Sequence, residues 1–162
     1  MQPRDPQRTV RLSVLDRLLE VDDAGAGTPW ARSVARHEAA LLRDLEWLLN
    51  TRQTIEPAGD AHPRVRDSVH HFGLADLTSL AAGSHEVRGE VLRQVEEAIH
   101  RFEPRLSRVR VVAVDDAPGG ARELRFAVEG LLQMDPEPRR VTFDTVLEVA
   151  SGAFQVNGGA RA

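Results

Sequence analysis

The stretch RFEPRL places one carboxylate, Glu103, between Arg101 and Arg105. Such a group acts as a catalytic acid when it keeps its proton near neutral pH, as in a glycosidase that also has a second carboxylate at a defined separation. Three aspartates are candidates for that second group: Asp76, Asp115 and Asp116. The sequence does not indicate that any of them lies near Glu103, and the flanking arginines favour its ionised form. The stretch therefore predicts an ion-pair site and argues against an acid catalyst.

The next residue, Pro104, disfavours helical dihedral angles at Glu103, so a helix arriving from the N-terminal side should end near Phe102 or Glu103. A carboxylate at that end meets the negative pole of the helix dipole, at a cost of about 0.3–1 kcal/mol. Arg101, Arg105 or a cation of another protein could compensate. An exposed pair within the chain would contribute only about 0–1 kcal/mol. Truncating a pair buried in an interface commonly costs about 2–5 kcal/mol of binding.

The six histidines do not form a recognisable metal site. His70 and His71 are adjacent and point in different directions on any regular element, while His37 and His100 lie in helical patterns without a partner four residues away. The chain has no cysteine, no glycine-rich phosphate loop, no nucleotide fingerprint and no nucleophile elbow. The sequence therefore predicts no metal, no cofactor and no catalytic residues.

The composition is typical of one globular domain. The chain has 162 residues, of which 41% are apolar and 28% are charged. A net charge of −4 and an aromatic content of 4% argue against nucleic acid or an acidic membrane as the main partner. No stretch is long and apolar enough for a signal peptide or a membrane span, which predicts a cytoplasmic protein without membrane insertion.

Residues 1–30 are expected to form a flexible N-terminal segment with a short amphipathic helix. Leu15, Leu18 and Leu19 make an apolar stripe at helical spacing, and the linker DDAGAGTP follows them. About two turns of helix are too short to be stable alone. The stripe must therefore dock, either on its own domain or on a partner protein.

Two longer helices should position the charged stretch. The first is predicted over residues 33–51, with Ser33 as its N-cap and a continuous face of leucines. The second is predicted over residues 84–102, immediately before the charged stretch. The connection between them reads as a loop over residues 53–66 and a short helical turn within residues 69–83.

Beyond the second helix the apolar pattern changes to a period of two residues, which is typical of strands. Strands are predicted over residues 107–116, 123–132 and 141–149, and Phe154 and Val156 either extend or cover the third strand. The order of elements predicts an α+β fold, in which two main helices pack on one face of a small antiparallel β-sheet meander.

This domain is expected to span residues 31–157, with a flexible tail over residues 158–162. We expect the strand near Val141 and Phe143 to form an edge of the sheet. An exposed edge can accept a strand from another chain, which suggests assembly as a function.

Five stretches occur in an order that is specific as a set: SVLDRLL, LEWLLNTR, FGLADLTS, FEPRL and VTFDTVLEVASGAFQV. With them the chain resembles, from about residue 12 to residue 156, the TssE family of bacterial type VI secretion baseplate subunits. That family is related to the lysozyme-like wedge proteins of contractile-tail phages. The resemblance does not extend to the loop 53–66, whose contacts stay open.

The resemblance implies a non-enzymatic structural subunit of the baseplate wedge, in the cytoplasm at the inner membrane complex. It implies the baseplate partners TssF, TssG and TssK, and a role in starting sheath polymerisation by TssB and TssC. The family's Glu-Pro-Arg motif corresponds to Glu103, Pro104 and Arg105, as an interaction motif. The lysozyme label belongs to a phage relative, and no glycosidase site carries over.

Two other functions remain as alternatives. A peptidoglycan-cleaving muramidase would use Glu103 as its acid, but a cytoplasmic protein without an export signal would need delivery to that substrate. A small adaptor domain of unrelated function would share the absence of a catalytic motif.

Overall fold

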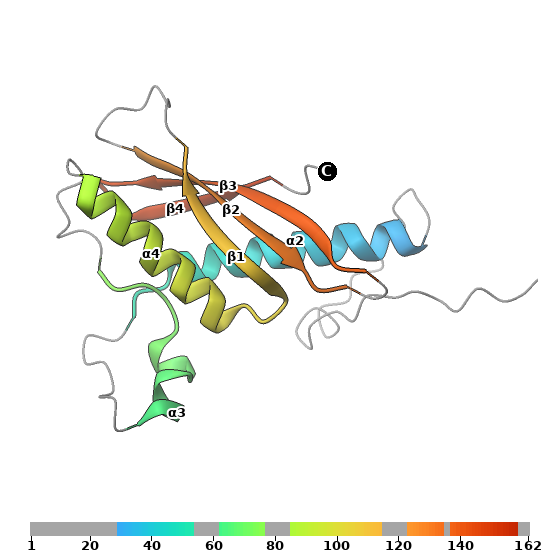
Figure 1. Ribbon diagram of the computed structural model, residues 1–162, viewed down its shortest axis with the longest axis horizontal. Helices are drawn as coiled ribbons and strands as arrows, with labels where there is room; N and C mark the ends of the chain where they lie inside the picture. Colours follow the sequence, from blue (N-terminus) through green and yellow to red (C-terminus); the bar gives the residue numbers. More distant parts are fainter. Residues whose placement is uncertain (1–28, 54–61, 77–84, 115–122, 135–136, 159–162) are drawn as a thin grey trace, which may run out of the picture.

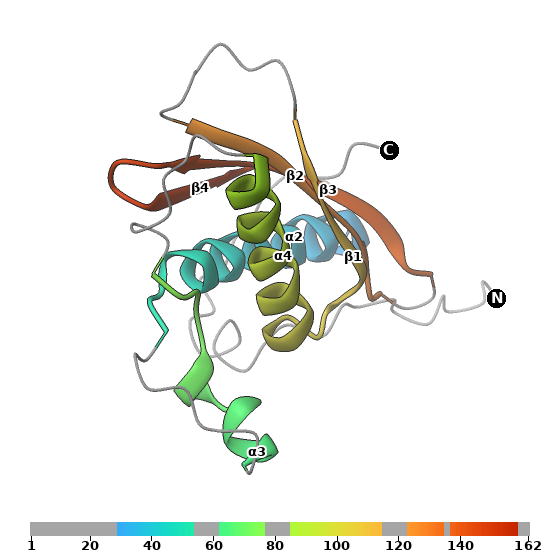
Figure 2. The same ribbon diagram turned by 60° about the vertical axis from the view of Figure 1, so that its left-hand side comes forward.

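The computed structural model describes residues 29–53, 62–76, 85–114, 123–134 and 137–158 (Figure 1). The N-terminal segment with Leu15, Leu18 and Leu19 therefore lies outside the described residues. The described elements form two layers, with two long helices on one side of a four-stranded sheet (Figures 1 and 2). This arrangement confirms the α+β fold class. None of the described helices is long and apolar enough to span a membrane.

Helix α2 (Pro29–Asn50) begins earlier than its pattern predicted. Ser33 lies inside the helix, so the prediction that it caps the N-terminus is wrong. Pro29 occupies the first helical position, where a proline has no hydrogen bond to lose and its φ angle already suits a helix. The predicted apolar face is buried, and its fully buried leucines are Leu41, Leu45, Leu48 and Leu49.

Helix α4 (His85–Phe102) ends where the proline predicted that it would. Its buried face packs against the sheet and against α2, and consists of Val91, Val95, Ala98 and Ile99. The first strand follows almost at once, so the end of α4 and the start of the sheet are held in a fixed relation.

The connection between the two helices contains more structure than the sequence indicated. Helix α3 (Pro63–Arg66) lies within the stretch predicted as loop, and the 3₁₀ helix η1 (Val69–His71) matches the predicted helical turn. A helix of four residues has too few positions to show a period, so only Pro63 at its first position could have suggested it.

The sheet is an antiparallel meander in the order β1-β2-β3-β4. Phe154 and Val156 belong to a separate fourth strand that pairs with β3, and they do not extend the third. The strands span β1 (Leu106–Ala113), β2 (Glu123–Leu132), β3 (Arg139–Glu148) and β4 (Ala153–Asn157). Val141 and Phe143 lie in β3, which is between β2 and β4 in the strand order, so the prediction that their strand is the outermost one is wrong. β4 pairs with β3 only from Asp144 to Glu148, and among the described strands Val141 and Phe143 pair with β2 alone.

One face of the sheet packs against the helices. Alternate residues of the strands are buried there, among them Phe126, Val128, Phe143 and Phe154. The Phe126 and Phe154 rings meet edge to face at 6.2 Å between centroids. The residues between them point to the opposite face, which carries cross-strand polar pairs such as Arg110 with Glu129.

Candidate functional site

The candidate site is the turn that joins α4 to β1. The backbone N–H of Glu103 donates to the Ile99 carbonyl at 2.9 Å, and the Leu106 N–H donates to the Glu103 carbonyl at 3.1 Å. Pro104 and Arg105 form the turn between these two bonds. The turn is therefore fixed at both ends by secondary structure.

Glu103 is buried, with 5% of its surface exposed. Its Oε1 accepts hydrogen bonds from the Arg105 Nε at 2.7 Å and from the Arg105 backbone N–H at 3.1 Å. Its Oε2 accepts from the Arg105 Nη2. This is a bidentate arginine–carboxylate pair, in which a backbone N–H adds a third bond.

The same guanidinium reaches α2. Arg105 Nη2 also donates to Asp44 Oδ2 at 2.7 Å, and the other oxygen of Asp44 accepts from Arg43 Nε at 3.0 Å and Nη2 at 2.8 Å. The Arg43 guanidinium lies over the Trp47 ring, 5.1 Å from its centroid. The four alternating charges form what we call the Asp44–Arg105 cluster: Arg43, Asp44, Glu103 and Arg105.

The cluster shows which cation compensates the negative charge of Glu103. Arg105 does so, whereas Arg101 pairs with Asp67 at 3.6 Å and lies against the Phe102 ring. The Glu103–Arg105 pair lies within the chain, which was one of the alternatives that the sequence left open. The sequence analysis expected such an intrachain pair to be exposed, but Glu103 is buried. Partial burial lowers the pKa of Arg105, but the hydrogen bonds and charges of Glu103 and Asp44 outweigh this and raise it.

The three motif residues differ in what they present to a partner. Glu103 is buried, the Arg105 side chain is 21% exposed, and Pro104 is exposed. Glu103 and Arg105 therefore hold the turn from inside, and Pro104 is the residue that another protein can reach.

Sequence reasoning did not find Asp44. It lies on α2 beside the buried leucine stripe, and no local pattern links it to a residue 61 positions later in the chain. Only the packing of α2 against the α4–β1 turn brings the two together. One sequence signal for Asp44 was its position at the margin of an apolar helix face. An acidic residue there is partly buried when the helix packs, which favours a cation nearby.

Of the aspartates considered as a second carboxylate, Asp76 does not join Glu103. Asp76 is exposed and lies 3.9 Å from Arg52, and Asp115 and Asp116 lie outside the described residues.

The two adjacent histidines differ in their surroundings. His71 is buried, with its Nδ1 3.2 Å from the Val65 carbonyl oxygen, while His70 is exposed. Among the described residues no group of three or more potential ligands could hold a metal ion.

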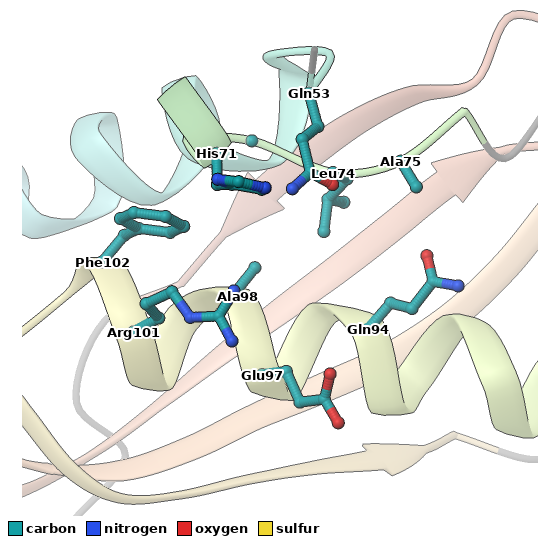
Figure 3. A pocket seen from close by; sticks show the side chains of 10 residues that line it. Gln53, His71, Leu74, Ala75, Gln94, Glu97, Ala98, Arg101 and Phe102 are labelled. Carbon is teal, nitrogen blue, oxygen red and sulfur yellow. The ribbon is translucent and has the colours of Figure 1, made fainter. Parts of the chain in front are cut away.

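A small open cleft of about 100 Å³ lies between the segment after η1 and helix α4 (Figure 3). His71 and Leu74 line one wall, and α4 contributes Glu97, Arg101 and Phe102. Figure 3 shows these side chains around the opening, with Gln53 and Gln94 beside them. Glu103 does not line this cleft, so the cleft and the turn are separate features.

The two edges of the sheet differ. The outer side of β1 is occupied at Val111, whose N–H donates to Glu96 Oε2 of α4 at 2.8 Å. Its pairing with β2 is also irregular between Ser107 and Arg110, where Arg108 has a φ of 51°. A bulge of this kind disfavours the addition of another strand.

The outer side of β4 is closed over only part of its length. The Asn50 side chain donates to the Phe154 carbonyl at 2.9 Å and accepts from the Phe154 N–H at 2.9 Å. An antiparallel strand turns the backbone groups of alternate residues to the same side, so Val156 is the next residue facing outwards. Within the described part of the chain, no hydrogen bond joins another element to Val156 on that side.

The fold and the site together define a two-layer α+β protein with a charged turn fixed by buried ion pairs and a partly open sheet edge. Comparison with protein families matches residues 35–137, more than half of the chain, to the family described as baseplate wedge protein gp25. The chain belongs to this family, and has a structural role in a phage-like baseplate together with other baseplate components. Searches of curated proteins and of solved structures found no match.

Proposed function

We propose that this protein is a wedge subunit of a type VI secretion baseplate and helps to start polymerisation of the contractile sheath. The family supports the baseplate role. The type VI assignment draws on the ordered stretches that resemble the TssE family. The observation that supports it most directly is the Glu-Pro-Arg turn, whose two charged residues are held inside the chain while Pro104 is exposed.

The turn is suited to contact with a partner because it is already ordered. A buried carboxylate, two arginine contacts and a proline leave the α4–β1 turn little conformational freedom to lose on binding. We assign Glu103 and Arg105 the task of shaping this surface, and Pro104 the contact itself.

The edge of β4 supports the second half of the proposal. An extended segment of a sheath subunit could pair with β4 at Val156, beyond the part that Asn50 closes. This replaces the strand of Val141 and Phe143 as the proposed edge, because β4 and not β3 is the outermost strand of the sheet.

We further propose the partners and the place of action. The partners are the baseplate subunits TssF, TssG and TssK and the sheath subunits TssB and TssC, with no nucleic acid and no insertion into the membrane. The protein would act in the cytoplasm, in a baseplate docked at the inner membrane complex. The stripe of Leu15, Leu18 and Leu19 would dock on one of these baseplate subunits.

We propose that the protein is not an enzyme. Both oxygens of Glu103 accept hydrogen bonds from Arg105, and the side chain does not reach the described cleft. Incubation with purified peptidoglycan tests this, with turbidity as the readout and Glu103→Gln as the matched variant. We expect no loss of turbidity with either protein. Clearing by the wild type that is lost in the variant would establish the muramidase instead.

Sheath formation in cells tests the assembly role. A strain lacking this gene and carrying a fluorescent sheath subunit should form no sheath foci, and the wild-type gene should restore them. A variant with Pro104→Ala should restore fewer foci, whereas Pro138→Ala, an exposed proline outside the turn, should restore them fully. Normal foci in the deletion strain would contradict the proposal.

A further inference from the structure

The segment over residues 62–71, here called the α3–η1 lobe, stands away from the two-layer body in both views (Figures 1 and 2). Among its described residues only His71 is buried, and α3 buries no side chain. The lobe therefore adds little to the core of the domain. Its role must be sought on its surface.

The base of the lobe is fixed to the body. The Leu74 N–H donates to the Thr51 carbonyl at 2.9 Å, and the Gln53 N–H donates to the Leu74 carbonyl at 2.8 Å. Gly73, the residue before Leu74, has a φ of 108°, and a Cβ at this position would lie only 2.3 Å from the Thr51 carbonyl oxygen. The Phe72 ring packs edge to face on Phe102, with centroids 5.4 Å apart.

The lobe is also ordered internally. Ser68 Oγ donates to the Val65 carbonyl at 2.7 Å and accepts from the His70 N–H at 3.3 Å. Asp67 faces Arg101 of α4 at 3.6 Å. The lobe thus has a defined shape and a defined direction relative to the body.

This ordered lobe exposes aliphatic side chains. Val69 is 89% exposed and Val65 is 39% exposed, and they are two of only four large apolar side chains exposed in the described part of the chain. Arg64 and Arg66 flank Val65 in the sequence, and the one acidic residue of the lobe, Asp67, is turned towards Arg101. The lobe therefore combines exposed arginines with exposed aliphatic side chains, on a protein whose net charge is −4.

We propose that the α3–η1 lobe docks on an acidic surface of another baseplate subunit, with Val69 in an apolar recess and Arg64 beside carboxylates of that subunit. The inference depends on the proposed baseplate function and names a contact within it. Charge complementarity identifies the partner, because cations around an exposed aliphatic group favour a surface of the opposite charge. A symmetric contact between two copies would bring like charges together.

The described cleft extends this surface. It includes His71, the last residue of the lobe, and Arg101, the partner of Asp67. A subunit bound to the lobe would therefore meet an opening large enough for part of one side chain, lined by His71 and Arg101.

Binding of the full-length chain to a purified TssF–TssG complex tests the proposal, with thermal melting measured in parallel. We expect Val69→Asp and Arg64→Glu each to weaken binding at least tenfold with an unchanged melting temperature, and the loss from Arg64→Glu to shrink at high salt. The controls are Val114→Asp and Arg88→Glu, an exposed valine and an exposed arginine outside the lobe, which should bind within about twofold of the wild type.

Undiminished binding by both lobe variants would overturn this inference alone, because the wild type would still bind the baseplate subunits. A wild type that does not bind would overturn the proposed function as well. A photo-crosslinking residue in place of Val69 identifies the occupant. A crosslink to an acidic peptide of TssF or TssG supports the proposal, and a crosslink to a second copy of this chain contradicts it.

Discussion

Arg105 bonds to one carboxylate two residues before it and to another 61 residues before it. Its guanidinium therefore links the α4–β1 turn to α2, and the link is largely shielded from water. A partly buried ion pair contributes little net stability compared with apolar packing, but removing one partner exposes the cost of burying the other. The two partners of this pair should differ in that cost, because Glu103 is more deeply buried than Arg105.

We expect Arg105→Ala to destabilise the domain more than Glu103→Ala. Without Arg105 the Glu103 carboxylate stays buried with no cation, at a cost of about 3–5 kcal/mol of unfolding free energy. Without Glu103 the arginine keeps Asp44 and some access to water, so the expected loss is about 1–3 kcal/mol. Urea unfolding of the purified variants measures both.

The exposed Arg93, which pairs with Glu90 and Glu97 on the surface of α4, provides the matched control. Arg93→Ala should unfold at a urea concentration close to that of the wild type. Equal stability of Arg105→Ala and wild type would mean that the cluster is not important for the fold.

The sequence was sufficient to predict an ion pair at Glu103, because a carboxylate between two arginines and before a proline has few other arrangements. It could not decide between Arg101 and Arg105. That choice depends on the direction of each side chain after the helix has ended, and on Asp44, which only helix packing brings near. The burial of the ion pair depends on the same helix packing and could not be predicted from the sequence either.

Among the elements, β4 is an outermost strand of the sheet. Five residues long, it pairs with β3 on its inner side, and the side chain of Asn50 bonds to both backbone groups of Phe154 on its outer side. The amide of Asn50 thus replaces one residue of a neighbouring strand. Any strand added from outside must begin beyond it, at Val156.

We expect Val156→Pro to block sheath assembly while the domain stays folded. Proline removes the N–H that faces outwards and leaves the pairing with β3, which uses the alternate residues. Val156→Ala is the control, because it also loses buried apolar surface, at about 1–2 kcal/mol, but keeps the N–H. Sheath foci in cells measure the effect, beside melting curves of both proteins. Normal foci with a folded proline variant would remove β4 as the point of strand addition.

Element types followed well from periodicity, and element positions in the sheet did not. The strand over 123–132 matches β2 at both ends, since alternation and turn residues mark it clearly. Strand order is a property of pairing between distant segments, so the strand of Val141 and Phe143 was assigned to the outermost position, which β4 occupies. The start of α2 was also missed, because a serine at a plausible cap position outweighed a proline four residues earlier.

At the scale of the whole molecule, the helices cover one face of the sheet and leave the other with polar residues. The described core between the layers is formed by residues of α2, α4 and the strands. The docking of the N-terminal stripe, whose residues lie outside the described part of the chain, stays a prediction.

Deleting residues 1–20 should leave the melting temperature nearly unchanged and weaken co-purification with TssF and TssG. A triple variant, Leu15→Ala, Leu18→Ala and Leu19→Ala, should weaken it to a similar degree. The polar neighbours Asp16 and Arg17, changed to alanine together, are the control and should co-purify normally. A melting temperature lowered by many degrees after the deletion would show that the segment packs on its own domain.

Helix α2 is joined to distant parts of the chain at two points along its axis. Arg105 ties the α4–β1 turn to Asp44, and Asn50 ties β4 to the last residue of the helix. A baseplate that triggers contraction is a mechanical device, so a pull on the turn at Pro104 and a pull on the edge of β4 would both be transmitted to this one helix. The rigidity of α2 then determines how far a displacement at the turn is felt at the sheet edge, more than 50 residues later in the sequence but one helix away in space.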